Sequence, residues 1–460
     1  MAYQSINPST GQTLQNFDTL DDTQLEAKLS AAAAGFEVWR NHSMADRAQV
    51  LVRAAALLQE HADTFARPVT LEMGKLFAQA QGEVALSASI LRYYADQGEL
   101  FLATQMLKPA TGLAHVENSP LGVILGVQPW NFPYYQLARF AAPNLMAGNV
   151  VMVKHAATVP QCAVAFEHLW RDAGAPAGVY TNLRVTHAQI DQLIDDPRVQ
   201  GVALTGSAEA GQRVAARAGQ NLKKSTMELG GSDAFIVLED ADLDAAVRWA
   251  VAAKMNNNGQ SCVAAKRFIV VDALADRFLS QFQHALAALV PGDPMDGATT
   301  LAPMASESAL LKLLAQVQGA VAAGATLLMG GQRIDRPGSY MQPTVLATIS
   351  ARNPAWREEF FGPVALFFRV RNDDEAVALA NDSPFGLGAS IFTQDPARGR
   401  RMASRIEAGM VFINHPTGSA ADLPFGGIKQ SGYGRELSSL GIHEFVNKKL
   451  VRTADVGDPA

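Results

Sequence analysis

One of the two cysteines in the sequence stands in surroundings that suit a nucleophile. Cys262 follows Asn257-Asn258-Gly259-Gln260-Ser261, a glycine-containing turn that leads into an apolar run. A thiolate attacks a carbonyl carbon readily once its pKa is lowered or its proton is removed. A lone cysteine is more often a small buried side chain, and we expect that role for Cys162, which lies in a helical pattern without polar neighbours. Taken by itself, Cys262 would be assigned the same role.

A glutamate that ends a predicted strand is a candidate base. Glu228 lies in Met227-Glu228-Leu229-Gly230-Gly231, and its two glycines permit close backbone approach and unusual dihedral angles. Such a carboxylate can act as a general base that activates the thiol or a water molecule. The commoner role of a glutamate at a strand end is that of a solvated charge, so Glu228 alone is not decisive.

An asparagine after the predicted strand Val123–Val127 is the third candidate. It lies in Gln128-Pro129-Trp130-Asn131-Phe132-Pro133. The Asn131 amide could donate a hydrogen bond to a developing oxyanion, which is worth about 3 kcal/mol in comparable sites. The alternative is a turn asparagine before an aromatic-proline corner, and without further context this alternative would be preferred.

Seven motifs, spread over nearly the whole chain, resemble those of the aldehyde dehydrogenase superfamily in order and spacing. They are Leu71-Glu72-Met73-Gly74-Lys75, Trp130-Asn131-Phe132-Pro133, Glu228-Leu229-Gly230-Gly231, Gly259-Gln260-x-Cys262, Glu359-x-Phe361-Gly362-Pro363-Val364, Asn381-Asp382-x-x-Phe385-Gly386-Leu387 and Pro424-Phe425-Gly426-Gly427-x-Lys429-x-Ser431-Gly432. A chance match to one motif is plausible, but a chance match to all seven is not. The resemblance implies an α/β protein with the aldehyde dehydrogenase fold, in which a Rossmann-like cofactor domain accompanies a catalytic α/β domain.

The resemblance also implies a role for each catalytic residue. Cys262 attacks the aldehyde and forms a thiohemiacetal, whose oxyanion is held by the Asn131 amide and the Cys262 backbone N–H. Hydride transfer to a nicotinamide leaves a thioester, which is hydrolysed by water that Glu228 activates. The covalent intermediate divides one difficult oxidation into two easier steps.

A cofactor site is expected beside these residues. Gly206-Ser207-x-x-x-Gly211 opens a helix after the predicted strand Val199–Leu204, so free backbone N–H groups can face a pyrophosphate. The resemblance implies that Lys154, counted with both the catalytic and the cofactor residues, contacts the adenosine ribose. It also implies that Glu359 holds the nicotinamide ribose. The remaining cofactor residues that it implies are Trp130, Leu229 and Phe361.

The residues after Lys154 depart from the pattern of family members that are strict for NAD. Those proteins follow the lysine with Pro-x-Glu, whereas this chain has His155-Ala156-Ala157. Ala157 in place of a carboxylate removes repulsion against a 2′-phosphate, so we expect either NAD or NADP to serve. His155 could neighbour that phosphate, but a turn histidine with its hydrogen bonds satisfied is the preferred interpretation.

The expected substrate is succinate semialdehyde. Arg139 follows Asn131 in a helix predicted to start near Pro133, and succinate-semialdehyde dehydrogenases carry an arginine there that grips the distal carboxylate. A second arginine, common six residues before the cysteine, is replaced by Asn256. A better match is the YneI-type (Sad) branch of bacterial succinate-semialdehyde dehydrogenases. Ser419 could donate its hydroxyl to the same carboxylate. The motifs shared with that branch are Lys154-His155-Ala156, Glu228-Leu229-Gly230-Gly231-Ser232-Asp233, Ala264-Ala265-Lys266-Arg267-Phe268-Ile269 and Gly434-Arg435-Glu436-Leu437.

Three other functions stay open. The substrate could be another ω-carboxylated or aliphatic aldehyde, such as glutarate semialdehyde. Acyl transfer to coenzyme A needs no water-activating base, so Glu228 argues against it. A non-catalytic binding protein with this fold is disfavoured because the catalytic and cofactor residues are all retained.

The predicted elements place these residues at strand ends. The first hundred residues read as helices, with capping candidates at Asp21 to Thr23 and at Ser43-x-x-Asp46, and a third helical stretch near Glu83–Met106. After Pro109, apolar runs alternate with helical patterns, which favours parallel sheets covered on both faces. The runs are Val123–Val127, Val150–Lys154, Val199–Leu204, Asp233–Leu238, Phe268–Val271, Ala365–Val370, Ala389–Thr393 and Met410–Asn414.

A domain junction is expected near Leu229–Gly231. The resemblance implies an NAD(P)-binding domain in residues 1–101 and 121–228, a catalytic domain in 229–425, and oligomerisation segments in 102–120 and 426–460. The alternating segment Phe445–Val451 reads as an exposed edge strand, which invites pairing with another subunit. A homodimer or a homotetramer would both fit.

Composition excludes several classes of partner. The 460 residues carry a net charge of −6 and so offer no basic surplus for nucleic acid. The apolar runs are far shorter than the ~20 residues that span a bilayer. We expect no membrane partner, and a cytoplasmic location because only two cysteines occur and the N-terminus lacks the features of a signal peptide. The sequence has no metal-ligand cluster, so no catalytic metal is expected.

Overall fold

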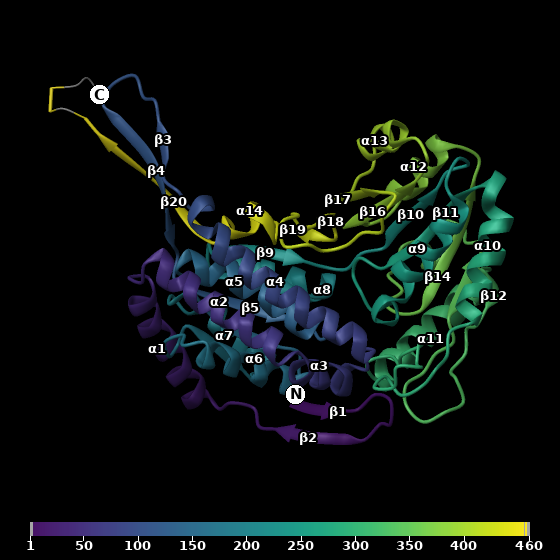
Figure 1. The fold of residues 1–460 in the computed structure, drawn as a ribbon, viewed down its shortest axis with the longest axis horizontal. Coiled ribbons are helices and arrows are strands. Elements are labelled where there is room, and N and C mark those ends of the chain that lie inside the picture. Colours follow the sequence, from purple (N-terminus) through teal and green to yellow (C-terminus); the bar gives the residue numbers. More distant parts are fainter. Residues whose placement is uncertain (1–2, 455, 458–460) are drawn as a thin grey trace.

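A computed structural model describes residues 3–454 and 456–457 of the chain. Its first sheet has six strands in the order β19-β9-β8-β5-β6-β7, all parallel except β19 (Figure 1). The strands are β5 (Val123–Gln128), β6 (Val150–His155), β7 (Tyr180–Leu183), β8 (Val199–Thr205), β9 (Lys224–Glu228) and β19 (Gly432–Tyr433). The predicted strands at β5, β6 and β8 are confirmed to within one residue. The short strand β7 was not predicted.

The topology of this sheet creates a site for ligands. The chain runs from β5 through β6 to β7 on one side, and then returns to place β8 and β9 on the other side of β5. The order of strands therefore reverses between β5 and β8. In open α/β sheets ligands bind at such a switch point, beyond the carboxyl ends of the strands. The segments that follow β5 and β8 contain Asn131 and Ser207.

Helices cover both faces of the first sheet. They are α1 (Asp22–Trp39), α2 (Met44–Glu60), α3 (Ala62–Met73), α4 (Phe77–Phe101), α5 (Pro133–Ala147), α6 (Pro160–Asp172), α7 (His187–Asp195), α8 (Ala208–Gln220) and α14 (Ser438–Ile442). The predicted caps are confirmed, since Asp21 and Ser43 each form a capping box. The helical stretch predicted near Glu83–Met106 was wrong at both ends. Helix α4 starts at Phe77 and stops at Phe101, because the following residues pair as a strand instead.

The second sheet has seven strands in the order β12-β13-β14-β11-β10-β16-β17. They are β10 (Asp233–Val237), β11 (Ala265–Val271), β12 (Thr326–Met329), β13 (Thr344–Ala347), β14 (Val364–Val370), β16 (Gly388–Phe392) and β17 (Met410–Ile413). All neighbours are parallel except β12 and β13. The runs predicted at β10, β11, β14, β16 and β17 are confirmed, although β11 begins three residues earlier than Phe268.

An apolar core lies on each face of the second sheet. Along β10, Phe235 and Val237 join one cluster of buried side chains, whereas Ala234 and Ile236 join another. This alternation is that of a strand covered on both faces. The covering helices are α9 (Leu243–Met255), α10 (Asp272–Ala287), α11 (Glu307–Ala322), α12 (Asp373–Asn381) and α13 (Pro396–Ala403), with 3₁₀ turns at η1 (Asn256–Gly259) and η2 (Pro354–Trp356).

A three-stranded arm projects from the body of the molecule (Figure 1). It consists of β3 (Gln105–Leu107), β4 (Leu113–Pro120) and β20 (Val446–Thr453) in the order β20-β4-β3. The predicted edge strand is confirmed, because β20 pairs with β4 alone. The described part of residues 426–460 contributes to three sheets: β18 (Ile428–Lys429) forms a small pair, β19 joins the first sheet and β20 enters the arm. Two small pairs complete the strands, β1 (Tyr3–Ile6) with β2 (Thr13–Phe17) and β15 (Phe385–Gly386) with β18 (Ile428–Lys429).

Among the described residues, no helix combines the length and the apolar character that a membrane crossing requires.

Candidate active site

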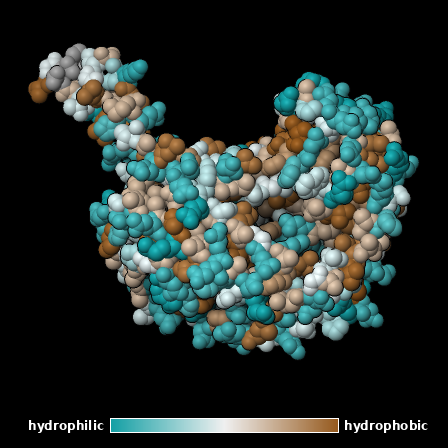
Figure 2. Space-filling model, viewed as in Figure 1, coloured by the Kyte–Doolittle hydropathy of each residue, from teal (hydrophilic) through white to brown (hydrophobic). Residues whose placement is uncertain are grey.

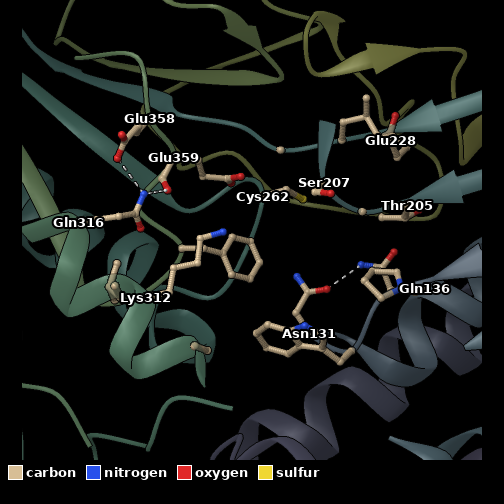
Figure 3. Close-up of a pocket in the computed structure, with 18 residues that line it drawn as sticks. Asn131, Gln136, Thr205, Ser207, Glu228, Cys262, Lys312, Gln316, Glu358 and Glu359 are labelled. Atoms are coloured by element: carbon tan, nitrogen blue, oxygen red, sulfur yellow. Dashed lines mark hydrogen bonds between the residues drawn. The ribbon is translucent and has the colours of Figure 1, made fainter. Parts of the chain in front are cut away.

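The first sheet with its helices forms one lobe of the molecule, and the second sheet with its helices forms the other (Figure 1). A cavity of about 460 Å³ lies between these two lobes, where the surface of the molecule is hollowed (Figure 2). Asn131, Ser207, Glu228, Cys262 and Glu359 all line it (Figure 3). Asn131 and Ser207 follow β5 and β8, Glu228 ends β9, Cys262 precedes β11 and Glu359 follows η2, so both lobes contribute to the wall. The structure thus brings together residues that the sequence separates by more than two hundred positions.

The loop that carries Cys262 has an unusual backbone. Asn257, Asn258 and Gly259 have φ angles of 52°, 53° and 74°, in the left-handed region that disfavours residues with a Cβ. At Gly259 a close approach requires glycine, because an added Cβ would lie 2.2 Å from the Gly362 carbonyl oxygen. The loop presents Cys262, half-buried, to the cavity.

The thiol of Cys262 is neutral in the ligand-free site. Burial raises its pKa to about 12, and the negative charges of Glu228 and Glu359 add to this rise. Arg139 and Lys266 act in the opposite direction, but burial outweighs them. Because the thiolate is the reactive species, Cys262 needs a base or a change in its electrostatic surroundings before it can attack.

Glu228 has the properties of that base. Both its carboxylate oxygens are buried without a hydrogen-bond partner in the part of the chain that the structure describes. Burial raises the pKa of Glu228, and Glu436 raises it further, while Arg139 and Arg435 oppose the change. The close approach of Gly426, where an added Cβ would lie 2.8 Å from Glu228 Oε1, keeps the site enclosed. A buried carboxyl with a raised pKa is suited to proton transfer near neutral pH.

Asn131 is held by hydrogen bonds at both its side chain and its backbone. Its Nδ2 donates to the Gln260 carbonyl oxygen at 3.1 Å, and its Oδ1 accepts from Gln136 Nε2 at 3.3 Å. Its backbone carbonyl oxygen accepts from Lys75 Nζ at 3.0 Å and from Asn257 Nδ2 at 2.7 Å. An amide Nδ2 has two N–H groups, so one remains to stabilise an oxyanion formed at Cys262.

Replacing Asn131 by alanine should lower kcat by about 10²–10³-fold and change KM little, because the lost N–H acts on the charge that develops in the transition state. Steady-state kinetics of aldehyde oxidation measure the effect. Asn144→Ala is a matched control, since Asn144 is equally buried but donates to the Phe140 carbonyl away from the cavity. Equal losses of kcat in the two variants would contradict the assigned role.

A buried ion pair positions Asn131, and no role was predicted for either of its members. Lys75 and Glu83 form a salt bridge in which both side chains are almost fully buried. Glu83 Oε1 also accepts from the backbone N–H groups of Tyr134 and Tyr135, which lie in the first turn of α5. The pair therefore joins α4, the start of α5 and the Asn131 carbonyl. Lys75 belongs to the motif Leu71–Lys75, but nothing in that motif identified Glu83 as its partner.

The cofactor-facing wall contains the start of α8. Ser207 caps this helix, since its hydroxyl accepts from the Ala210 N–H. The backbone of Gly206 is open to the cavity, because an added Cβ at this residue would have only Leu204 within 4 Å. This opening, together with the free N–H groups of the first helical turn, suits a phosphate group.

The remaining cofactor residues also fit a dinucleotide. Lys154, the last residue but one of β6, is a buried lysine that does not itself line the cavity. Burial lowers its pKa, and no hydrogen bond or salt bridge holds its ammonium within the described chain. On the cavity wall, Phe361 packs edge to face against Trp130, with ring centroids 5.7 Å apart. Glu359 lines the same cavity as Cys262 (Figure 3). An unpartnered lysine, an open helix start and an aromatic pair are the features that a nicotinamide dinucleotide would use.

Arg139 does not line the cavity, although the resemblance implies that it grips the distal carboxylate of the substrate. Its side chain is 1% exposed and forms a salt bridge with Glu436. One terminal nitrogen donates to Gln136 Oε1 at 3.0 Å and to Thr205 Oγ1 at 3.2 Å, and the other donates to the Tyr135 hydroxyl at 3.1 Å. The charge of the buried guanidinium is balanced by Glu436, which comes from the distant C-terminal region.

A hydroxyl chain connects Arg139 to Ser419. The Tyr135 hydroxyl accepts from Arg139 and donates to Ser419 Oγ at 2.8 Å. The Ser419 hydroxyl is half-buried and donates to no other described group. Successive hydrogen bonds polarise one another, so the positive charge of Arg139 makes the Ser419 hydroxyl a stronger donor through Tyr135. Tyr135 was not among the residues predicted from the sequence.

Two other expectations are changed by the structure. Cys162 is fully buried, as predicted, but it does have polar neighbours, because its N–H donates to Glu72 Oε2 at 3.0 Å. His155 is a buried residue of β6, not a turn residue. One ring nitrogen lies 3.2 Å from the Gln128 carbonyl oxygen, and the other has no partner within the described ranges. In those same ranges there is no group of acidic, histidine or cysteine side chains that could hold a metal ion.

The sequence matches a family model described as the aldehyde dehydrogenase family over residues 1–451. It is 52% identical to a succinate-semialdehyde dehydrogenase [NADP(+)] of Deinococcus radiodurans, with 98% of this chain and 94% of that protein covered. It is 48% identical to a probable succinate-semialdehyde dehydrogenase [NADP(+)] of Synechocystis, with 98% and 99% covered.

The fold is similar to that of a solved succinic semialdehyde dehydrogenase from Streptococcus pyogenes, determined in complex with NADP+ as the cofactor. The TM-score is 0.97 and the sequence identity 44%, with 99% of this chain and all of that chain covered. The similarity extends over both lobes and the arm, so the expected fold class is confirmed.

Proposed function

The chain belongs to the aldehyde dehydrogenase family, and we propose that it oxidises succinate semialdehyde to succinate with NADP as the hydride acceptor. The observation that carries this proposal is the meeting of Cys262, Glu228 and Asn131 on the wall of one cavity. The similarity to relatives named for this substrate and cofactor supports it.

The first half of the reaction is attack by Cys262 on the aldehyde carbon. The thiol proton leaves as the carbon–sulfur bond forms, and Glu228 is the buried base available to accept it. The oxygen of the thiohemiacetal gains negative charge, and the free N–H of Asn131 together with the Cys262 backbone N–H stabilises it. The nicotinamide supplies the acceptor for the hydride that leaves the same carbon.

The second half is hydrolysis of the thioester on Cys262. Glu228 first releases the thiol proton to solvent, and its unpartnered carboxylate then takes the proton that water loses as it attacks the thioester carbon. The carbon–sulfur bond breaks, the Cys262 thiolate takes back a proton from Glu228, and the acid is released.

The distal carboxylate of the substrate is held by the hydroxyl chain. Ser419 ends this chain with a hydrogen that no described group accepts, and Arg139 behind Tyr135 strengthens it as a donor. Arg139 therefore acts on the carboxylate through the two hydroxyls rather than by direct contact. A site that satisfies a charged group by hydrogen bonds discriminates strongly against an analogue that lacks it.

Ser419→Ala should lower kcat/KM for succinate semialdehyde by about 10–100-fold, which corresponds to the loss of one hydrogen bond to a charged group. The rate with butanal, which has no carboxylate, should change by less than about threefold, because no partner of the hydroxyl is lost. Tyr135→Phe should follow the same pattern.

Steady-state formation of the reduced nicotinamide measures both rates. The matched control is Ser404→Ala, because Ser404 is an exposed serine on the far end of α13 whose hydroxyl donates to the Arg401 carbonyl. Equal losses with both aldehydes in Ser419→Ala would mean that the chain does not bind the carboxylate. A preference for glutarate semialdehyde in the wild type would transfer the proposal to that longer substrate.

The preference for NADP follows from the absence of a carboxylate near Lys154. Ala157 has no charge to repel a 2′-phosphate, and Lys154 offers an unpaired ammonium nearby. NAD lacks that phosphate, so it should serve less well but is not sterically barred.

The arm formed by β3, β4 and β20, with exposed Met106, Leu113 and Leu450, would bury these side chains against another copy of the chain in a homo-oligomer.

A further inference from the structure

Lys266 connects the nucleophile to the cofactor-facing wall. Its side chain is completely buried, and its Nζ donates to the Ser261 carbonyl oxygen at 2.7 Å and to the Cys262 carbonyl oxygen at 2.8 Å. The same Nζ lies 3.1 Å from Glu359 Oε1. An ammonium has three N–H donors, so these three contacts satisfy it completely.

Glu359 is the outer end of this connection. Its Oε1 also accepts from the Gly231 N–H at 3.1 Å, and its side chain is 19% exposed toward the cavity. An added Cβ at Gly230 would lie 2.2 Å from Glu359 Oε2, so the carboxylate packs directly on the Leu229–Gly231 junction. Glu359 thus contacts both Lys266 and the space where a ligand would bind.

We propose that Lys266 is a positioning residue with two effects on Cys262. It fixes the backbone of this cysteine, and it makes the ionisation of the thiol depend on the charge and the hydrogen bonds of Glu359. While Glu359 pairs with Lys266, the carboxylate offsets the field of the ammonium at the thiol. When Glu359 is neutralised or accepts other hydrogen bonds, more of that field acts on Cys262 and favours its thiolate. The inference rests on the proposed role of Cys262 as nucleophile, but not on the identity of the aldehyde.

The charges around the pair are consistent with this arrangement. Cys262 is influenced by Arg139 and Lys266, which favour the thiolate, and by Glu228 and Glu359, which oppose it. Lys266 in turn lies near Lys254 and Asp233. Burial and the charge of Lys266 lower the pKa of Lys254 well below its usual value, and Lys254 has no hydrogen-bond partner among the described residues. Arg139 is paired with Glu436, whereas Lys266 touches the backbone of Cys262 itself.

The rate at which iodoacetamide alkylates Cys262 in the cofactor-free enzyme tests this proposal, because the rate follows the thiolate fraction. Lys266→Met should slow alkylation by about tenfold, which corresponds to a rise of one unit in the pKa of the thiol. Glu359→Gln should accelerate it by at least about threefold, since the offsetting carboxylate is gone. Rates are taken across a pH series, and peptide mass spectrometry assigns the label to Cys262 rather than to the fully buried Cys162.

Two further variants separate this role from a general loss of packing. Lys254→Met removes a second fully buried lysine, whose Nζ has no hydrogen-bond partner in the described chain, and should leave the alkylation rate unchanged. In the double variant Lys266→Met/Glu359→Gln, the change at Glu359 should accelerate alkylation less than it does when Lys266 is present. Only the direct repulsion between Glu359 and the Cys262 thiolate is then relieved.

Four results would overturn the inference. They are a rate in Lys266→Met that equals or exceeds the wild-type rate, a rate in Glu359→Gln that is unchanged or lower, equal slowing in Lys254→Met, and an undiminished effect of Glu359→Gln in the double variant. Should Lys266→Met fail to fold, Glu359→Gln alone still tests the sign. Failure of the proposed function would instead appear as aldehyde oxidation that survives the loss of Cys262.

Discussion

Cys262→Ser should retain cofactor binding but oxidise succinate semialdehyde at least about 10⁴-fold more slowly than the wild-type enzyme. The serine hydroxyl ionises far less readily than a thiol, and an alkoxide in this loop would meet the same burial that already raises the pKa of Cys262 to about 12. Glu228, even with its raised pKa, is too weak a base to deprotonate a hydroxyl appreciably. Steady-state kinetics and fluorescence titration with NADP separate the two properties.

Cys162→Ser is the matched control for this substitution. It makes the same change of atom at a side chain that is fully buried in α6 and absent from the cavity wall. Its effect should be a lower melting temperature with kcat within about twofold of the wild type, since only packing is altered. Comparable losses of kcat in both variants, or appreciable turnover in Cys262→Ser, would refute the nucleophilic role of Cys262.

The positions of the site residues in the fold could be predicted because their signals are local. Asn131 and Ser207 directly follow strands whose apolar runs are visible in the sequence, and parallel strands bring their carboxyl ends to one edge of a sheet. Glu228 ends β9, where the two following glycines marked a change of direction. The motifs of the family supplied the chemistry that these residues alone left open.

The partners of buried charges could not be predicted, because they come from distant parts of the chain. Arg139 was expected at the substrate entrance, but Glu436 enters from the C-terminal region and pairs with it inside the protein. Glu83, on α4, likewise meets the start of α5 through packing that no local pattern records. A buried charge needs a partner, yet the sequence does not say which of many candidates provides it.

The ends of some elements were equally beyond local reasoning. The apolar pattern after Glu83 continues past Phe101, but the chain leaves α4 there because Gln105–Leu107 pairs with β4 in the arm. Helical propensity in such a segment is overridden by pairing partners that lie in a separate part of the sequence. The same holds for β19, which is only two residues long and is fixed by its pairing with β9.

Glu228→Gln should release about one equivalent of reduced nicotinamide per active site in a burst and then turn over about 10²–10⁴-fold more slowly than the wild type. Glutamine keeps the size of the side chain but cannot take a proton from water, so the thioester on Cys262 accumulates. Rapid-mixing absorbance measures the burst, and intact-protein mass spectrometry detects the added acyl group. The burst should form more slowly than in the wild type, because Glu228 also accepts the thiol proton in the first half of the reaction.

The pH dependence gives the same assignment an independent test. Burial and Glu436 raise the pKa of Glu228, so at low pH the carboxyl is protonated and cannot act as a base. The rate of thioester hydrolysis in the wild type should therefore rise as the pH increases through that raised pKa, and level off above it. In Glu228→Gln this rise should be absent, because no titrating base remains.

Glu72→Gln is the matched control, since Glu72 is also a buried carboxyl whose pKa burial raises, to about 7. It accepts from the N–H groups of Gln161 and Cys162 at the start of α6, away from the cavity wall. This variant should lose stability but keep both wild-type turnover and the wild-type pH profile. If Glu72→Gln removed the rise with pH, or Glu228→Gln retained it, the base would have to be sought elsewhere, because the rise would then not report the ionisation of the carboxylate beside Cys262.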